Sequence, residues 1–263
     1  MPEGHTIHRL ARDLNATLGD APVVAWSPQG RFDSGAAALD GRPLVKAEAW
    51  GKYLFCDFGT DQVLHVHLGL IGKFRDRGAP APPVVGEIRL RLEGPGATWD
   101  LSGPTRCELV DPSEQDLITA KLGADPLRHR PDVGSARAKF ARTDRAVGAV
   151  LLDQSVVAGI GNVYRAEILF LCGIHPARPS RSLTDDEFDQ VWAETVRLLR
   201  IGMRLGRIIT TDPAEVGRPR SRMTNADRLY VYHQEFCRRC GDQLRTLDLG
   251  GRPIGFCPTC QPA

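Results

Sequence analysis

The spacing of apolar residues changes along the chain and predicts a helix, then strands, then further helices. Near the start, Ile7, Leu10, Ala11, Leu14 and Leu18 recur every three or four positions. This is the period of one apolar face of an α-helix. We therefore expect an amphipathic helix that begins just after residue 3.

Short apolar runs separated by Gly, Pro and Asp follow this first helix. Several alternate apolar with polar residues, as in Ile88-Arg89-Leu90-Arg91-Leu92, a pattern typical of half-buried antiparallel strands. The runs cover residues 23–26, 44–47, 53–58, 63–68, 87–92 and 97–100. This part of the chain predicts a β-sandwich or a flattened barrel, flanked by the N-terminal helix.

From Pro126 onward the apolar spacing is helical. Gly159-Ile160-Gly161-Asn162 stands between two apolar stretches, so its glycines should end one helix and open another. Asn162 and the first N–H groups of the second helix could bind a phosphate, although a plain helical corner explains the same glycines. Thr184 to Glu187 has the pattern of a capping box that opens a further helix. Residues 212–228 are polar, carry arginines that include Arg218, Arg220 and Arg222, and lack periodicity, so we expect a mobile basic loop there.

Four of the seven cysteines form two pairs near the end of the sequence. The pairs Cys237/Cys240 and Cys257/Cys260 have the Cys-x2-Cys spacing that surrounds one tetrahedral Zn²⁺ with four thiolates. Four cysteines leave no open coordination position, so the predicted zinc ion is structural. Gly250-Gly251 between the pairs fits the tip of a hairpin, which predicts a zinc β-ribbon.

Length, charge and cysteine usage narrow the class of protein. The 263 residues suffice for two domains, and the chain has neither an 18-residue apolar run nor a signal-peptide pattern. Residues 1–125 carry 13 basic and 17 acidic side chains (−4), whereas residues 126–263 carry 21 and 15 (+6), which favours the second half for binding a polyanion. The paired cysteines indicate metal in a reducing compartment. Cys56, Cys107 and Cys172 lie in apolar settings and are expected to be small core residues.

Several other residues have both a functional and an ordinary explanation. Lys52 opens a strand behind a glycine, where a phosphate can approach, but a lysine at a strand edge also prevents unwanted pairing. His67 follows His65 on one face of a strand, either as a phosphate ligand or as a packed histidine. Leu70 lies between glycines and is either core or a wedge that enters a base stack. Arg252, at the predicted hairpin tip, can reach a phosphate or a flipped nucleotide, or simply face solvent.

The first three residues combine an amine with a carboxylate. Removal of Met1 is usual before a small residue, and it would leave the secondary amine of Pro2 beside the carboxylate of Glu3. An α-amine titrates near ~8, well below a lysine, so more of it is nucleophilic at neutral pH. The positive end of the adjacent helix also disfavours a protonated amine. Taken alone, an ordinary processed terminus explains the same residues.

Five segments in order along almost the whole chain resemble the formamidopyrimidine-DNA glycosylase and endonuclease VIII family of base-excision repair enzymes. They are Met1-Pro2-Glu3-Gly4, Gly51-Lys52-Tyr53-Leu54, His67-Leu68-Gly69-Leu70, residues 159–164 with 173–176, and residues 251–252 with 256–261. The resemblance implies an α+β multidomain architecture. Its parts would be an N-terminal catalytic β-sandwich domain (1–120), a helix–two-turn–helix DNA-binding domain (126–228) and a four-cysteine zinc-ribbon finger (229–263).

The resemblance also implies a mechanism. The family flips a damaged nucleotide out of the duplex. The Pro2 amine would then attack C1′ and form a Schiff base while Glu3 moves protons, and β- and δ-elimination would cut the strand. Lys52 and Arg252 would grip the flanking phosphates and assist elimination. Further contacts with DNA would come from His67, Leu70, Asn162 and Arg106.

Two departures from the family pattern bear on the substrate. Thr6 stands where many relatives carry a second acidic residue, and Gly103-Pro104-Thr105-Arg106-Cys107 lacks the phenylalanine of the purine-directed branch. Thr6 bears on a secondary role in proton transfer, whereas Gly4 after Glu3 and the missing phenylalanine of the wedge resemble the endonuclease VIII branch, which prefers oxidised pyrimidines. The alternatives are a glycosylase directed at 8-oxoguanine and formamidopyrimidines, and a non-catalytic zinc-ribbon protein that binds DNA. The expected partner is damaged double-stranded DNA with a flipped nucleotide. The protein is expected to act as a monomer in the cytoplasm, associated with the nucleoid, and not to bind a membrane.

Overall fold

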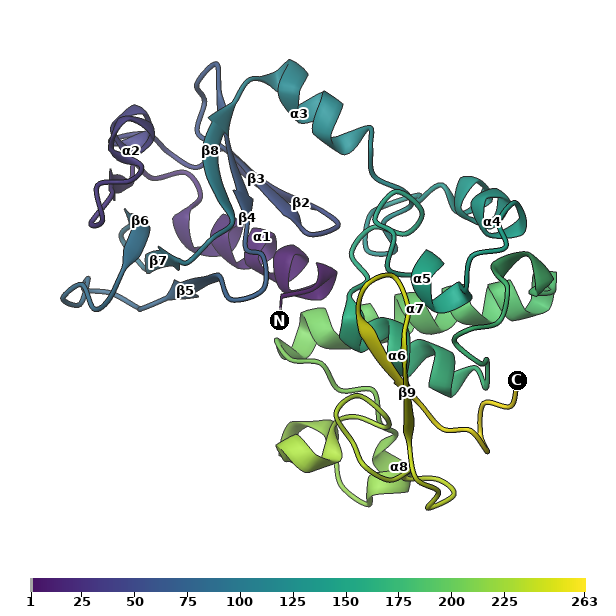
Figure 1. Cartoon of the computed structure of the whole chain (residues 1–263). Helices are drawn as coiled ribbons and strands as arrows, with labels where there is room; N and C mark the ends of the chain where they lie inside the picture. Colours follow the sequence, from purple (N-terminus) through teal and green to yellow (C-terminus); the bar gives the residue numbers. More distant parts are fainter. Residues whose placement is uncertain (1) are drawn as a thin grey trace. The chain divides into compact units, whose positions relative to one another are not determined.

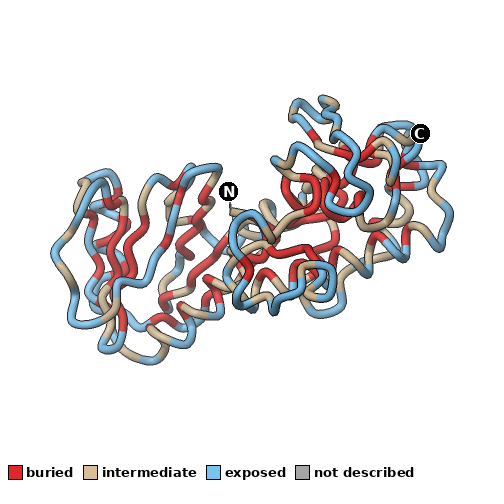
Figure 2. The backbone as a smooth tube through the Cα atoms, turned by 90° about the horizontal axis from the view of Figure 1, so that it is seen from below, coloured by how far each residue is buried: buried red, intermediate tan, exposed pale blue. Residues whose placement is uncertain are grey.

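A computed structural model describes residues 2–263 of the chain. The chain divides into two compact units, residues 1–121 and residues 122–263. Each unit has its own buried interior, drawn in red in Figure 2. The further division of the second unit into a helical domain and a ribbon finger stays a prediction.

Two four-stranded antiparallel sheets form the first unit (Figure 1). Apolar side chains of both sheets share one core, so the predicted β-sandwich is confirmed. One sheet runs in the order β1 (Val24–Trp26), β6 (Ile88–Glu93), β7 (Thr98–Ser102) and β5 (Lys73–Asp76). The other runs in the order β2 (Lys46–Trp50), β3 (Tyr53–Asp57), β4 (Val63–His67) and β8 (Arg106–Val110).

The predicted N-terminal helix is α1 (Gly4–Leu18), and its expected apolar face is buried. α1 packs against β2 and β3. Asn15 ties the helix to β2, because its amide donates to the main-chain oxygen of Ala47 at 2.7 Å and accepts from the Ala47 N–H at 2.6 Å. The position of α1 on the sheet is therefore set by apolar packing along the helix and by a reciprocal pair of hydrogen bonds near its C-terminal end.

Some elements of the first unit have no apolar pattern of their own. β5 buries only Phe74, and β8 pairs with β4 although most of its residues are only partly buried. Two helices, α2 (Asp33–Leu39) and α3 (Pro112–Thr119), were also not expected, and β2 begins at Lys46 and not at residue 44. Pairing to neighbouring strands specifies β5 and β8, so their own periodicity carries little signal.

Helices are the main regular elements of the second unit, as the sequence predicts. They are α4 (Val133–Ala141), α5 (Val147–Val150), α6 (Asn162–Leu171), α7 (Asp185–Leu205) and α8 (Pro213–Val216). The capping box of α7 is confirmed: the Thr184 hydroxyl accepts from the Glu187 N–H at 3.2 Å, and the Glu187 carboxylate accepts from the Thr184 N–H at 2.8 Å. A hairpin of β9 (Arg245–Asp248) and β10 (Pro253–Phe256) follows near the end of the chain.

Two expectations for the second unit were wrong in detail. The helix before the glycines ends at Val150, and residues 151–161 form turns that lead into α6. Residues 212–228 are not an irregular loop, because they contain α8 and two 3-10 turns, Arg220–Arg222 and Asn225–Asp227. Within residues 2–263, no helix has the length and hydropathy needed to cross a bilayer.

Candidate active site and metal cluster

Glu3 caps the N-terminus of α1 and is fully buried. Its main-chain oxygen accepts the N–H of Thr6 at 2.8 Å, and Pro2 beside it is half-buried. Negative charge is favoured at the N-terminus of a helix, so a carboxylate fits this position. Met1, and with it the predicted processing, lies outside the described residues. Pro2 and Glu3 stay the predicted catalytic pair.

Lys52, His67 and Arg106 meet at one end of the β2-β3-β4-β8 sheet. Trp50 pairs with Tyr53, so Lys52 lies in the two-residue turn between β2 and β3 and not in the strand. The same rung continues from Tyr53 to His67 on β4 and to Arg106 on β8. Burial, and then the nearby His65, Lys52 and Arg106, hold the pKa of His67 below its usual value. This end of the sheet therefore offers two permanent cations and a neutral imidazole, a set suited to phosphate oxygens.

The next residue pair on the same face of the sheet, two positions along the strands, orients Arg106. His65 on β4 pairs with Glu108 on β8, and the Glu108 Oε1 atom lies 3.1 Å from His65 Nδ1 and 3.2 Å from Arg106 Nη1. The His65 ring is buried and stacks on Phe55, with centroids 4.8 Å apart. Burial lowers the pKa of His65, which keeps the ring neutral. The sequence reasoning did not identify Glu108, although its alternation with Arg106 along a strand was a readable signal.

Leu70 and Ile71 form an exposed apolar tip between β4 and β5. Their exposed fractions are 59% and 79%, which excludes the interpretation of Leu70 as core. The turn beneath them is tight: Gly69 has φ +66°, and a Cβ atom there would lie 1.9 Å from the Thr105 hydroxyl. Two apolar side chains on a rigid, exposed turn have the geometry of a wedge between bases.

In the second unit, Asn162 opens α6 as predicted, but its side chain is largely buried and hydrogen-bonded. The Asn162 amide donates to the main-chain oxygen of Pro253 at 3.0 Å, and its oxygen accepts from Arg165 Nε at 2.9 Å. Asn162 thereby joins the start of α6 to the hairpin. Its predicted contact with a phosphate is not tested by this geometry.

Arg165, which the sequence reasoning left without a role, holds the hairpin tip. Its guanidinium is fully buried and donates to the main-chain oxygens of Gly148, Leu249 and Arg252 at 2.8–2.9 Å. The tip is the predicted hairpin turn, since Gly250 and Gly251 have φ +66° and +69° and Leu249 donates to the Arg252 oxygen at 3.1 Å. A charged residue inside the apolar run of α6 was the available signal for Arg165.

The four paired cysteines come together at the base of this hairpin. Their sulfur atoms all lie within 4.8 Å of one another, with Cys237 and Cys260 3.8 Å apart and Cys240 and Cys257 3.4 Å apart. Tetrahedral Zn–S bonds of about 2.3 Å place sulfurs roughly 3.8 Å apart. The cluster could therefore hold a metal ion of this size.

Protonation within the cluster is uneven. The Asp242 main-chain N–H lowers the pKa of Cys240, while burial and the neighbouring thiols raise the pKa of Cys260. A divalent cation among the sulfurs would stabilise all four thiolates. By contrast, burial raises the pKa of Cys107 and of Cys172 to about 12. Cys56 is buried in the core of the first unit, and Cys107 and Cys172 are partly buried and pack against the two cores.

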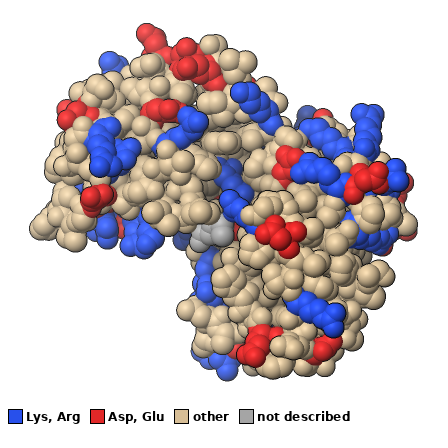
Figure 3. Space-filling view, in the orientation of Figure 1, with Lys and Arg blue, Asp and Glu red and all other residues tan. Residues whose placement is uncertain are grey.

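Charge on the visible surface is mixed. On the face shown in Figure 3, lysine and arginine side chains are scattered and interspersed with aspartate and glutamate. This agrees with the net charge of +2. Any DNA-binding residues must then be identified one by one from local geometry, because no single basic patch dominates this face.

Comparisons with known proteins agree with this geometry. Residues 1–110 match the formamidopyrimidine-DNA glycosylase N-terminal domain, and residues 122–214 match the H2TH domain of the same enzymes. The protein named Endonuclease 8 1 of Mycobacterium tuberculosis is 45% identical over 267 residues, covering 99% of this chain and all of the relative. The formamidopyrimidine-DNA glycosylase of Laribacter hongkongensis is 29% identical, covering 98% of this chain and 95% of that protein.

Solved structures of Lactococcus lactis Fpg have the same fold. One, a complex with DNA that contains an oxidised pyrimidine, has a TM-score of 0.81 and 25% identity and covers the whole of both chains. A complex with abasic-site DNA has a TM-score of 0.79, also at 25% identity. The chain belongs to the formamidopyrimidine-DNA glycosylase and endonuclease VIII family, the DNA glycosylases of base-excision repair that also have AP lyase activity.

Proposed function

We propose that this chain removes oxidised pyrimidines from DNA with the Pro2 amine as nucleophile and then cuts the strand by β- and δ-elimination. The observation that carries the proposal is the fully buried Glu3 carboxylate, held at the N-terminus of α1 directly after Pro2. A carboxyl group in this setting can move protons next to an amine that attacks C1′. Glu3 would assist opening of the sugar ring and departure of the base.

The remaining steps follow from the Schiff base. The imine acidifies the C2′ proton, so its removal breaks the C3′–O bond, and a second elimination breaks the C5′–O bond. Both departing phosphates carry negative charge, which the cations Lys52 and Arg252 would stabilise. His67, Arg106 and Asn162 would position the DNA backbone. A gap with a phosphate on each side would remain.

Two features support the preference for pyrimidines: the exposed tip between β4 and β5, and the residue at position 107 on β8. Leu70 and Ile71 supply an aliphatic wedge, and Cys107 stands where the purine-directed branch has phenylalanine. The 45% identical relative is named an endonuclease 8. Single-stranded and bubble substrates place a smaller demand on a wedge than intact duplex does.

We also infer that the four clustered cysteines bind one structural Zn²⁺. The support is the spacing of the sulfurs, together with four thiolate ligands that leave no open position. The metal would fix the base of the hairpin whose tip carries Arg252. The protein would act as a monomer on chromosomal DNA in the bacterial cytoplasm.

Borohydride trapping tests the nucleophile. Protein that begins at Pro2 should form a covalent adduct with oligonucleotides bearing thymine glycol or an abasic site. The same protein with Met1 retained should bind these oligonucleotides without forming the adduct. Absence of an adduct with correctly processed protein would contradict the proposal.

A panel of duplexes tests the substrate. Strand cleavage should be faster at thymine glycol or dihydrouracil than at 8-oxoguanine, whereas an abasic site should be cut irrespective of the lost base. Faster cleavage at 8-oxoguanine would assign the chain to the purine-directed alternative. Equal binding without cleavage of any substrate would support the non-catalytic alternative.

A further inference from the structure

Two arginines lie between the first pair of clustered cysteines, in Cys237-Arg238-Arg239-Cys240. Both contact the arginine segment, which we define as residues 212–228. Arg238 Nη2 donates to the main-chain oxygen of Ala226 at 2.5 Å. Arg239 Nη2 lies 3.0 Å from the carboxylate of Glu215. We call residues 237–240, which carry two of the four sulfurs, the knuckle. The knuckle therefore contacts the arginine segment at two separate points.

Arg239 also packs on aromatic rings of the unit's interior. Its guanidinium carbon lies 5.3 Å from the Phe170 ring centroid and 4.9 Å from that of Tyr230. Both distances are those of cation–π contacts. The Tyr230 hydroxyl in turn accepts the N–H of Asp212 at 3.0 Å. One arginine thus links the knuckle, α6 and the N-cap of α8.

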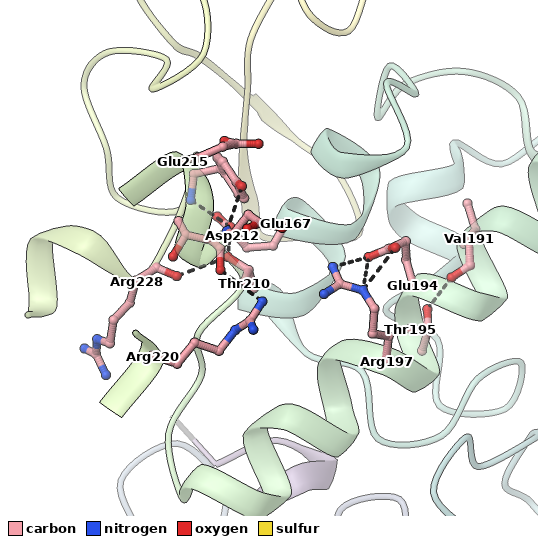
Figure 4. Close-up of polar contacts among 12 residues, drawn as sticks. Glu167, Val191, Glu194, Thr195, Arg197, Thr210, Asp212, Glu215, Arg220 and Arg228 are labelled. Atoms are coloured by element: carbon pink, nitrogen blue, oxygen red, sulfur yellow. Dashed lines mark hydrogen bonds and ion pairs between the residues drawn. The ribbon is translucent and has the colours of Figure 1, made fainter. Parts of the chain in front are cut away.

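The two ends of the arginine segment are fixed independently of the knuckle. Glu167 on α6 is fully buried, and its carboxylate accepts the N–H groups of three consecutive residues, 230–232, at 2.8–2.9 Å. The same carboxylate accepts the Thr210 hydroxyl (Figure 4). The Thr210 N–H donates to the Arg228 oxygen at 2.9 Å, so the segment starts and ends at one place.

Within the segment, few contacts reach the rest of the unit. Arg207 donates to the main-chain oxygens of Arg220 and Met223, and Arg220 donates to that of Thr211. These contacts brace the middle of the segment. The two knuckle arginines add one contact each outside this middle part, Arg239 to Glu215 on α8 and Arg238 to the Ala226 oxygen.

We propose that Arg238 and Arg239 are positioning residues that couple metal binding at the four cysteines to the folded form of the arginine segment. A metal ion fixes the backbone of a Cys-x2-Cys knuckle, and loss of the ion releases it. Both guanidinium groups then lose their fixed positions. Glu167 continues to hold the ends of the segment while its body opens. Arg218 and Arg222, which are exposed on the segment, lose their fixed positions with it.

The inference rests on the proposed metal site, so metal content is measured separately. Hydrogen exchange of the zinc-loaded full chain should show protection in residues 212–228. In an Arg238→Ala/Arg239→Ala variant with zinc still bound, exchange there should rise about tenfold, which corresponds to ~1.4 kcal/mol of local stability. Residues 245–256 should keep their protection. Arg245→Ala, which removes an exposed arginine from the same ribbon, is the matched control and should leave both regions unchanged.

Chelation of zinc from the wild-type chain should raise exchange in residues 212–228 to the level of the double variant. If the double variant loses zinc, Glu215→Gln removes the Arg239 ion pair from the other side, and Arg239→Lys should give an intermediate rate. Unchanged protection of residues 212–228 in these variants would overturn the inference. Chelation that opens residues 245–256 but not 212–228 would also overturn it. A wild-type chain that binds no zinc would instead refute the metal site.

Discussion

Arg165 donates from Nη2 to the main-chain oxygen of Arg252 at 2.9 Å. Its Nε atom donates at the same distance to the side chain of Asn162. Asn162 and Arg252 are two predicted phosphate ligands that lie far apart in the sequence. One buried guanidinium therefore sets where both of them stand, so binding geometry should depend on a residue that contacts no DNA itself.

Arg165→Lys should weaken both stability and DNA binding. The planar guanidinium of Arg165 donates to four oxygen atoms. A lysine keeps the charge, but its single ammonium group cannot reach all four. Because the site is fully buried, the unfolding free energy should fall by about 2–4 kcal/mol. Urea unfolding and affinity for an abasic duplex measure the two effects. Arg200→Lys, at an exposed position of α7, should change neither.

Leu70→Ala together with Ile71→Ala should leave stability almost unchanged but slow base removal from duplex DNA. Both side chains face solvent, so the unfolding free energy should change by less than about 0.5 kcal/mol. A wedge matters only where a base stack must be kept open. Cleavage of a lesion in single-stranded DNA should therefore fall much less than cleavage in a duplex. Equal losses on both substrates would contradict the assignment of a wedge.

Leu68→Ala provides the contrast. Leu68 is 2% exposed and belongs to the sandwich core two residues before the tip. Its truncation should lower the unfolding free energy by about 2–4 kcal/mol. The two variants together separate the role of the exposed tip from that of the core beneath it.

Cys257→Ser should abolish metal binding. Cys257 is buried at the centre of the cluster, with its sulfur 3.4 Å from Cys240. A serine hydroxyl is a poor ligand for zinc in a site of thiolates, and ribbon folding is coupled to metal binding. Metal analysis should give no zinc, and thermal unfolding should show early loss of the second unit's C-terminal end. Cys172→Ser, outside the cluster, should retain the metal.

Parts of this arrangement were predictable because they depend on local pattern. The period of α1, the capping box at Thr184 and the glycine turn of the ribbon each follow from a few neighbouring residues. Arg165 and Glu167 did not follow, since their partners are main-chain groups contributed by distant segments. The order of residues 212–228 was missed for the same reason: it comes from long-range hydrogen bonds that leave no periodicity in the segment itself.

His5 should make stability depend on pH. Burial, aided by Arg9, lowers its pKa from 6.5 to about 3. Below about pH 6.5 His5 is protonated in the unfolded chain but stays neutral in the folded chain. The unfolding free energy therefore falls as the pH falls. The slope from this one group is about 1.4 kcal/mol per pH unit. Urea unfolding at about pH 7 and about pH 5 should show a smaller difference for His5→Gln than for the wild type.

His65→Phe should weaken DNA binding through Arg106. Phenylalanine preserves the stack on Phe55 and adds no charge, but it cannot donate to Glu108. Loss of one hydrogen bond, about 1 kcal/mol, predicts roughly fivefold weaker binding. The effect should vanish when Arg106 is already alanine, which a double-mutant cycle measures. A loss that persists in that background would mean that His65 affects DNA binding independently of Arg106.

Glu167 holds together the two ends of residues 211–229, and this bears on how far the length of that stretch can vary. Since the Thr210 hydroxyl and the Tyr230 N–H meet at the Glu167 carboxylate, the ends of this stretch are held together by a group outside it, and each doubling of its length would cost only about 0.6 kcal/mol of closure entropy. Changes of length should therefore be tolerated in the largely exposed part, residues 213–219, and not at Thr211 or Met223, which are buried in the unit.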